Sequence, residues 1–256
     1  MNWKTFFALL ARDGHVARRN LLPMLLQNLL QPLLLVFVFG RVLTSSGMMP
    51  AAYKSMLLPG VMAISMVLSG IQAVAMPLIA EFQFTREIED RLLAPIEIGW
   101  LAVEKVVAGM IQALVAGLVV IPAAWLVMGS GVNISFRQPL EFAAVCLLVA
   151  LFSASGGLTL GCSVGQTQIG LMFSLVLAPM MMFGCAYYPW SALSAFPALK
   201  IAVLINPLVY ASEGLRGALA PQVPHIPVAV VLAALLVIDV VLLAAGLNRF
   251  HHKAVS

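Results

Sequence analysis

Charged side chains are scarce in this sequence. Asp, Glu, Lys and Arg make up only 9% of the 256 residues, whereas 62% of the residues are hydrophobic. Soluble domains carry about 25% charged residues, and too little polar surface remains here to cover a water-soluble fold. The composition therefore predicts an integral membrane protein. The net charge of +4 forms no dense Lys/Arg stripe, which excludes a typical nucleic-acid partner.

Motifs for nucleotide, metal and redox chemistry are also missing. The sequence has no G-x-x-x-x-G-K-[ST], no G-x-G-x-x-G and no H-E-x-x-H, so it predicts no catalytic, cofactor or metal site on this chain. The cysteines Cys146, Cys162 and Cys185 lie in apolar stretches without a C-x-x-C pair, which indicates small buried residues. Adjacent His251 and His252 are a weak metal signal.

Six apolar stretches are long enough to cross a bilayer, which takes about 20 helical residues. They cover residues 21–43, 55–80, 101–128, 139–162, 168–188 and 226–247. An even number of spans places both termini on one side. That side collects nine of the 14 Lys and Arg residues. The positive-inside bias therefore predicts cytoplasmic termini, and residues 1–256 form one multi-pass domain of a bacterial-type inner membrane.

The first 20 residues form a separate element before the first span. Apolar side chains recur near helical spacing among basic residues: Trp3, Phe6, Phe7, Leu9, Leu10, with Lys4, Arg12, Arg18 and Arg19. This pattern predicts an amphipathic helix lying in the membrane interface. The alternative is an extension of the first span, which is disfavoured because charges are costly at membrane depth.

The connection at residues 81–99 is the most charged part of the chain. Ile88, Leu92 and Ile96 make one apolar stripe of a short helix that Pro95 ends. The charged face consists of Arg86, Glu87, Glu89, Asp90 and Arg91. A solvated loop is the simple interpretation. The length of about 15 residues, well beyond what a turn needs, favours a docking surface for a soluble partner.

The connection at residues 189–224 is long and fairly apolar. Asn206 followed by Pro207 is a strong helix start, with an N-cap residue and then Pro at the first helical position. Glu213 and Arg216 have i, i+3 spacing and can pair on one helix face. The pattern predicts one or two short helices that dip back into the outer leaflet.

Two features inside the spans are also notable. Asp239 is an ionisable residue deep in the last span, about 15 Å from Arg249 along a helix. It is either a functional residue or a structural hydrogen-bonding group with a partner such as Gln72 or Gln112. Glycines recur every four residues at Gly157, Gly161 and Gly165, which predicts close approach of another backbone.

The order of these motifs resembles the membrane subunit of a type-2 ABC transporter, the exporter-type permease family of drug, lipid and polysaccharide exporters. The motifs are Gln31-Pro32 with Gly40, the charged stretch from Arg86 to Ile96, and Asn206-Pro207-Leu208-Val209-Tyr210 with Glu213 and Arg216. One departure is Glu89-Asp90, which stands where the family often has a glycine-threonine pair.

The resemblance implies a transporter of two permease halves and two ATPase subunits that carry ATP and Mg²⁺. Residues 86–91 would form the coupling helix that contacts the ATPase, and the outer segment with Tyr210 would cover the exit path. The second half would be another copy of this chain or a sister chain. The apolar spans suit a hydrophobic or amphipathic cargo, namely a lipid, a lipid-linked glycan or a drug.

Two other classes compete with this interpretation. A secondary transporter would use Asp239 as its coupling residue, but such transporters usually show an internal repeat, and none is visible here. A membrane enzyme would need acids or histidines clustered near an interface, whereas the acids here gather in one amphipathic stretch. Dependence on a separate ATPase distinguishes the ABC permease from both.

Overall fold

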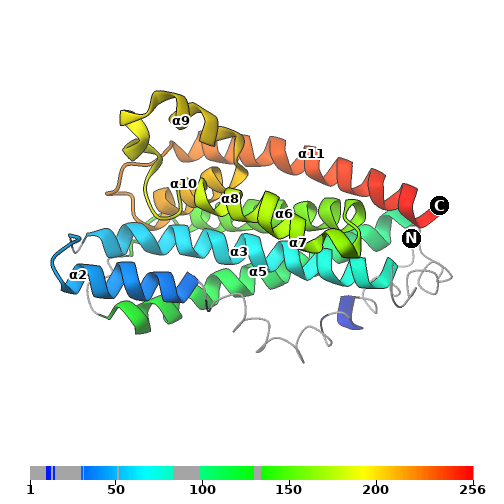
Figure 1. Cartoon of the computed structure of the whole chain (residues 1–256), viewed down its shortest axis with the longest axis horizontal. Coiled ribbons are helices and arrows are strands. Elements are labelled where there is room, and N and C mark those ends of the chain that lie inside the picture. Colours follow the sequence, from blue (N-terminus) through cyan, green and yellow to red (C-terminus); the bar gives the residue numbers. More distant parts are fainter. Residues whose placement is uncertain are drawn as a thin grey trace.

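The structure is a computed structural model that describes residues 10–12, 14, 30, 32–50, 52–82, 98–129 and 134–255. Every regular element in these ranges is helical (Figure 1). The predicted interfacial helix at residues 1–20 and the predicted coupling helix lie almost entirely outside the described residues. The all-α membrane class that the sequence predicts agrees with the described part.

Within the described residues, four helices are long and apolar enough to cross a membrane. They are α3 (Tyr53–Ala80), α5 (Ile98–Met128), α6 (Pro139–Ser163) and α11 (Val228–Val255). They coincide with four of the predicted spans. The last helix continues past the predicted end at residue 247, because a helix that leaves the apolar layer can still extend through its polar residues.

Two further apolar helices are shorter as far as the structure describes them, and most of the first predicted span before Pro32 lies outside the described residues. Pro32–Ser45 combines the π-helical η1 (Val36–Val42) with α2 (Leu43–Ser45). Ile169–Met182 is built from α7 (Ile169–Met172), the π-helical η4 (Phe173–Leu177) and α8 (Ala178–Met182), after the 3-10 turn η3 (Gln166–Gln168). The predicted span at 168–188 was therefore too long, since the helix stops at Met182. The count of six spans stays a prediction.

Between α8 and α11 the chain makes a bent excursion. It contains the 3-10 helix η5 (Trp190–Ala195), then α9 (Pro197–Ala202), the 3-10 helix η6 (Val203–Ile205) and α10 (Pro207–Leu219). The α9–η6 piece and α10 meet at 98°. The helix α10 is buried from Leu208 to Leu219 except at Tyr210, and it packs against α3, α6 and α11.

The helix α3 forms the centre of the bundle. Residues 57–71 are all buried, and α3 packs against α5, α6 and α10. The predicted close approach at the glycines is confirmed for two of the three. A β-carbon on Gly157 would lie 2.8 Å from the Ile71 carbonyl oxygen, and one on Gly161 would lie 2.9 Å from Ala75 Cα. Gly165 follows the end of α6.

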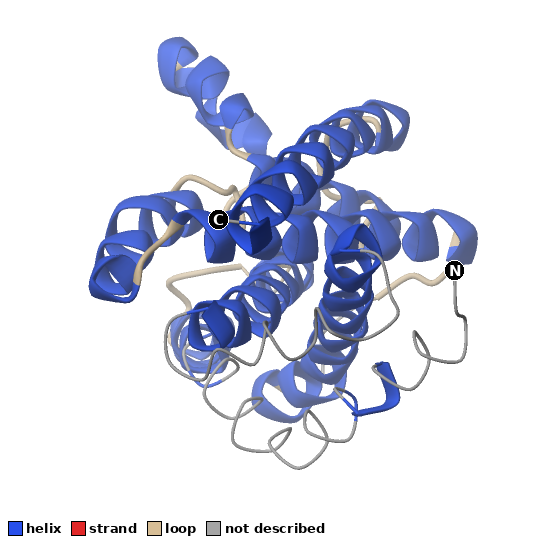
Figure 2. Ribbon diagram, turned by 90° about the vertical axis from the view of Figure 1, so that its right-hand side faces the viewer, coloured by secondary structure: helices blue, strands red, loops and turns tan. Residues whose placement is uncertain are grey.

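The bundle has two distinct ends. We call the end where α3, α6 and α11 finish and α5 begins the basal end, and the opposite end, which carries residues 183–227, the apical end (Figure 1). The long helices run side by side when viewed from the basal end (Figure 2). At the apical end Lys54 donates to the Met128 carbonyl at 3.1 Å. This cation complements the negative C-terminus of α5.

Candidate functional site

The Asn206-Pro207 motif begins α10, as the sequence predicts. Asn206 Oδ1 accepts a hydrogen bond from the backbone N–H of Leu208 at 3.0 Å, which is an N-cap. The same amide donates to the Met180 carbonyl at 2.7 Å and so fixes α8 beside the start of α10. Tyr210 donates to the Leu204 carbonyl at 2.9 Å and closes the bend between η6 and α10.

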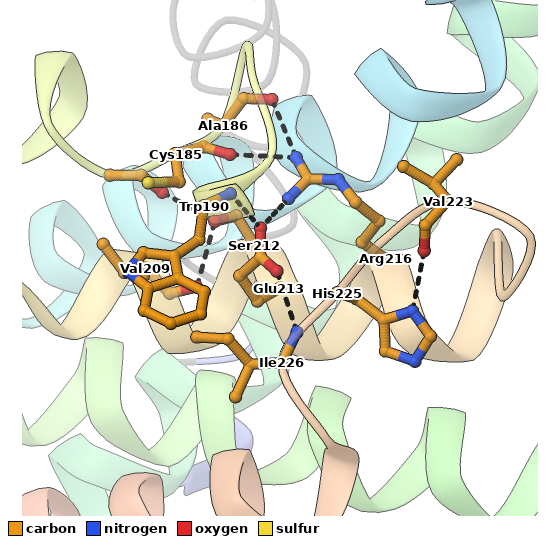
Figure 3. A network of polar contacts seen from close by, with 11 residues as sticks. Cys185, Ala186, Trp190, Val209, Ser212, Glu213, Arg216, Val223, His225 and Ile226 are labelled. Atoms are coloured by element: carbon orange, nitrogen blue, oxygen red, sulfur yellow. Dashed lines mark hydrogen bonds and ion pairs between the residues drawn. The ribbon is translucent and has the colours of Figure 1, made fainter. Parts of the chain in front are cut away.

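Glu213 and Arg216 form an ion pair, and both side chains are completely buried. The pairing predicted from their spacing is therefore confirmed. Glu213 also accepts two backbone hydrogen bonds: Oε1 from Trp190 N at 2.9 Å and Oε2 from Ile226 N at 3.0 Å (Figure 3). These two residues lie just inside the start and just beyond the end of the outer segment 189–224. A single carboxylate therefore holds both ends of that segment.

The guanidinium of Arg216 binds the turn that follows α8. Its Nη2 donates to the Cys185 carbonyl at 2.9 Å and more weakly to that of Ala186 at 3.5 Å (Figure 3). Ser212 donates to the Gly184 carbonyl at 2.6 Å. Cys185 has a φ of 52°, so the backbone turns out of the helical path here and presents its carbonyls to α10. This turn is why the predicted span ends early.

The first turns of α3 complete the arrangement. Tyr53 donates to the Tyr187 carbonyl at 2.8 Å. A β-carbon on Gly60 would lie 1.8 Å from the Ala186 carbonyl oxygen, so only glycine lets the turn lie against α3. We call Tyr53, Gly60, Glu213, Arg216 and the turn 184–190 the apical network.

Sequence reasoning found the ion pair of the apical network but not its partners. The groups bound to Glu213 and Arg216 are backbone N–H and C=O groups, and every residue except proline carries both. Gly60 and Gly184 stand out weakly as glycines in apolar stretches, and Tyr53 as a tyrosine at a helix start. None of these signals says which residues meet.

An apolar groove of about 500 Å³ lies beside the apical network. Its walls come from η4 and α8 with the following Phe183 and from the α9–η6 piece, and Asn206-Pro207 also line it. The lining residues are Val176, Pro179, Met180, Phe183, Leu199, Ala202, Val203, Ile205, Asn206 and Pro207. The amide of Asn206 is already hydrogen-bonded on both sides, so the groove favours an apolar ligand.

Asp239 lies on α11 and is 1% exposed. Within the described part of the chain, neither of its carboxylate oxygens has a hydrogen-bond partner. The hydrogen bond from Gln72 or Gln112 that would explain Asp239 as a purely structural group is thus not formed there. The role of Asp239 stays a hypothesis.

The remaining predicted site residues lie where the structure gives no description. The residues expected to contact the ATPase, Arg86, Glu87, Ile88, Glu89, Asp90 and Arg91, fall outside the described residues. The histidine pair at His251 and His252 is described at the basal end of α11. Among the described residues, no group of three His, Cys, Asp or Glu side chains could hold a metal ion.

The chain matches the family model of the ABC-2 type transporters over residues 4–220. Because the match covers most of the sequence, the chain belongs to this family, and the resemblance drawn from its motifs is confirmed. It is a transport subunit, and the family implies association with an ABC ATPase. A comparison with curated proteins found no match.

Proposed function

We propose that this chain is one membrane-spanning half of an ATP-driven exporter, with a second copy or a sister chain as the other half. Two ATPase subunits dock on the cytoplasmic segment 81–99 and supply ATP and Mg²⁺. The basal end faces the cytoplasm of a bacterial-type cell, and the apical end faces outward. Family membership supports this assignment. The sequence contains no phosphate-binding loop of its own, so ATP hydrolysis requires a separate subunit.

The apical network is the observation that supports a role for the outer segment as a cover of the exit path. Glu213 holds both ends of the segment, and Arg216 holds the turn before it. The buried ion pair and its backbone hydrogen bonds fix one geometry of the outer segment. Removing either residue of the pair would leave a buried charge unpaired. The outer segment, α10 included, therefore moves as one unit with the turn before it.

The cargo of the proposed exporter is hydrophobic or amphipathic. The groove between α8 and the α9–η6 piece supports this class, since its volume lies in the range of small-molecule sites. Its surroundings are apolar too: Leu175 is 70% exposed and Ile201 is 71% exposed. A hydrocarbon tail could lie there without losing any hydrogen bond. The choice among lipid, lipid-linked glycan and drug needs a transport assay.

The experiment that tests this function uses the chain with its ATPase in proteoliposomes and a fluorescent phosphatidylethanolamine as the probe. The expected result is ATP-dependent movement of the probe across the bilayer, which Arg216→Met abolishes. Arg137→Met removes an exposed cation at the same end and should leave the movement unchanged. Probe movement without ATP, in vesicles that hold this chain alone, would contradict the proposed function.

A further inference from the structure

A second buried ion pair lies at the basal end, far from the apical network. Lys105 Nζ on α5 lies 2.8 Å from Glu81 Oε1 at the end of α3, and the two side chains are 5% and 8% exposed. Taking both charges out of water costs several kcal/mol per ion. Two apolar side chains would fill the same space more cheaply, so stability alone does not explain this pair.

The chain neighbours of the pair, Phe82 and Val106, pack against, or belong to, an apolar cluster to which all four long helices contribute. The cluster consists of Val74, Leu78, Leu101, Ala102, Val106, Ala154, Leu158, Cys162 and Phe250. Phe82 packs edge-on against Phe250, with ring centroids 5.8 Å apart. Lys253 Nζ lies 4.9 Å from the centroid of Phe82. The residues around Glu81 therefore connect the end of α3 to α5, α6 and the C-terminal turns of α11.

Glu81 and Lys105 lie on either side of the predicted coupling helix in the sequence. Glu81 stands at the start of the segment 81–99 that holds the predicted coupling helix, and α5 begins at Ile98, two turns before Lys105. The ion pair thus joins the two helices from which that segment departs and to which it returns. With the pair formed, a displacement of the segment acts on α3 and α5 together. Without the pair, a displacement of the segment acts on the basal end of each helix separately.

We propose that Glu81 and Lys105 are positioning residues for energy coupling. They hold the basal ends of α3 and α5 in one register, so that movement of the docked ATPase reaches both helices as a single displacement. The contacts of Phe82 with Phe250 and Lys253 extend this displacement to α11. The inference rests on the proposed function and assigns it two residues outside the charged face at residues 86–91.

The test compares purified complexes of this chain with its ATPase. The double variant Glu81→Leu/Lys105→Met removes both charges together, so neither partner leaves the other as an unpaired ion, and it should fold and bind the ATPase in the normal ratio. We expect its stimulation of ATP hydrolysis to fall about fivefold or more, which is the lower range of coupling between distant sites. Lys105→Arg keeps the cation and should retain most of the stimulation.

A matched control removes the same two charge types at the apical end, as Arg137→Met/Glu141→Leu. This control should assemble and stimulate hydrolysis like the wild type. A basal double variant that assembles and hydrolyses ATP at the wild-type rate would overturn the positioning role and leave the pair as a structural contact. A wild-type chain that recruits no ATPase would instead refute the proposed function on which the inference rests.

Discussion

At the scale of single residues, Glu213 and Arg216 connect parts of the chain that lie far apart in the sequence. Their mutual pairing follows from i, i+3 spacing on one helix and could be predicted. Their further partners, at Trp190, Ile226 and Cys185, are backbone groups that leave no signature in the side-chain pattern. The sequence therefore revealed the pair but not that Glu213 binds both ends of the outer segment.

The first prediction concerns the cost of breaking this pair. Arg216→Met leaves the fully buried carboxylate of Glu213 without its cation, and such a loss destabilises by about 3–5 kcal/mol. Thermal unfolding in mild detergent should show a clearly lowered midpoint. Arg137→Met, at an exposed position of the same end, should shift the free energy of unfolding by less than about 0.5 kcal/mol. Equal midpoints for the two variants would contradict the role of the pair.

The second prediction concerns the contact between α3 and the turn after α8. Gly60→Ala would place a methyl group on the Ala186 carbonyl, so the turn must move away from α3. Cys185 lies in this turn and is fully buried, hence a maleimide should label it much faster in the variant than in the wild type. Gly170→Ala adds a methyl in open space and should leave the labelling rate unchanged. Unchanged labelling in both variants would argue against the tight contact.

At the scale of helices, local signals were sufficient at one boundary and insufficient at another. The start of α10 was predictable because an N-cap residue followed by Pro specifies it within two positions. The end of α8 was not, because residues 183–188 contain neither a charged residue nor a proline that would stop the helix. What ends the helix is the binding of the turn's carbonyls by Ser212 and Arg216, which are about 30 residues away.

The third prediction separates the two roles of Asn206. Asn206→Asp keeps the oxygen that caps α10 but loses the amide donor to Met180, whereas Asn206→Ala loses both. The cap alone contributes about 1 kcal/mol. We expect Asn206→Ala to be the less stable of the two by that amount, as measured by unfolding in detergent. Equal unfolding midpoints for the two variants would show that the N-cap contributes nothing measurable to the stability of the protein.

The fourth prediction concerns the charged coupling helix. Charge reversal at Glu87 or Asp90 should lower the stimulation of ATP hydrolysis without unfolding the permease, because the ATPase contact is electrostatic and solvent-accessible in this proposal. Reversal at Arg137, on the apical side, is the control. Normal stimulation in both the Glu87→Lys and the Asp90→Lys variants would show that the docking surface lies elsewhere.

At the scale of the whole molecule, hydropathy identified a helical membrane protein, and three of the long helices were placed to within about three residues at both ends, whereas the last one continues to Val255, past its predicted end at residue 247. The total of six stays a prediction, because Ile169–Met182 is shorter than a full crossing and the first predicted span is described only from Pro32 onward, apart from Leu30. Residues 197–219, in turn, form a bent helix pair. Hydropathy measures how apolar a stretch is, not where its backbone bends.

The fifth prediction concerns Asp239, the buried acid of α11. Ionisable residues at membrane depth are rare and usually functional, so Asp239→Asn should lower ATP-dependent movement of the phosphatidylethanolamine probe. The variant is nearly isosteric, and its assembly with the ATPase should be normal. Unchanged transport would leave Asp239 as a structural residue. It would also remove the remaining basis for a coupling-ion mechanism.

The central claim is that this chain works with a separate ATPase. The most direct measurement is purification of the tagged chain from its native membrane in mild detergent, with mass spectrometry of its partners and an ATPase assay of the eluate. The account predicts a stoichiometric soluble subunit with a phosphate-binding loop, and ATP hydrolysis that falls with Glu87→Lys. A chain that elutes alone and transports its cargo without ATP would contradict it.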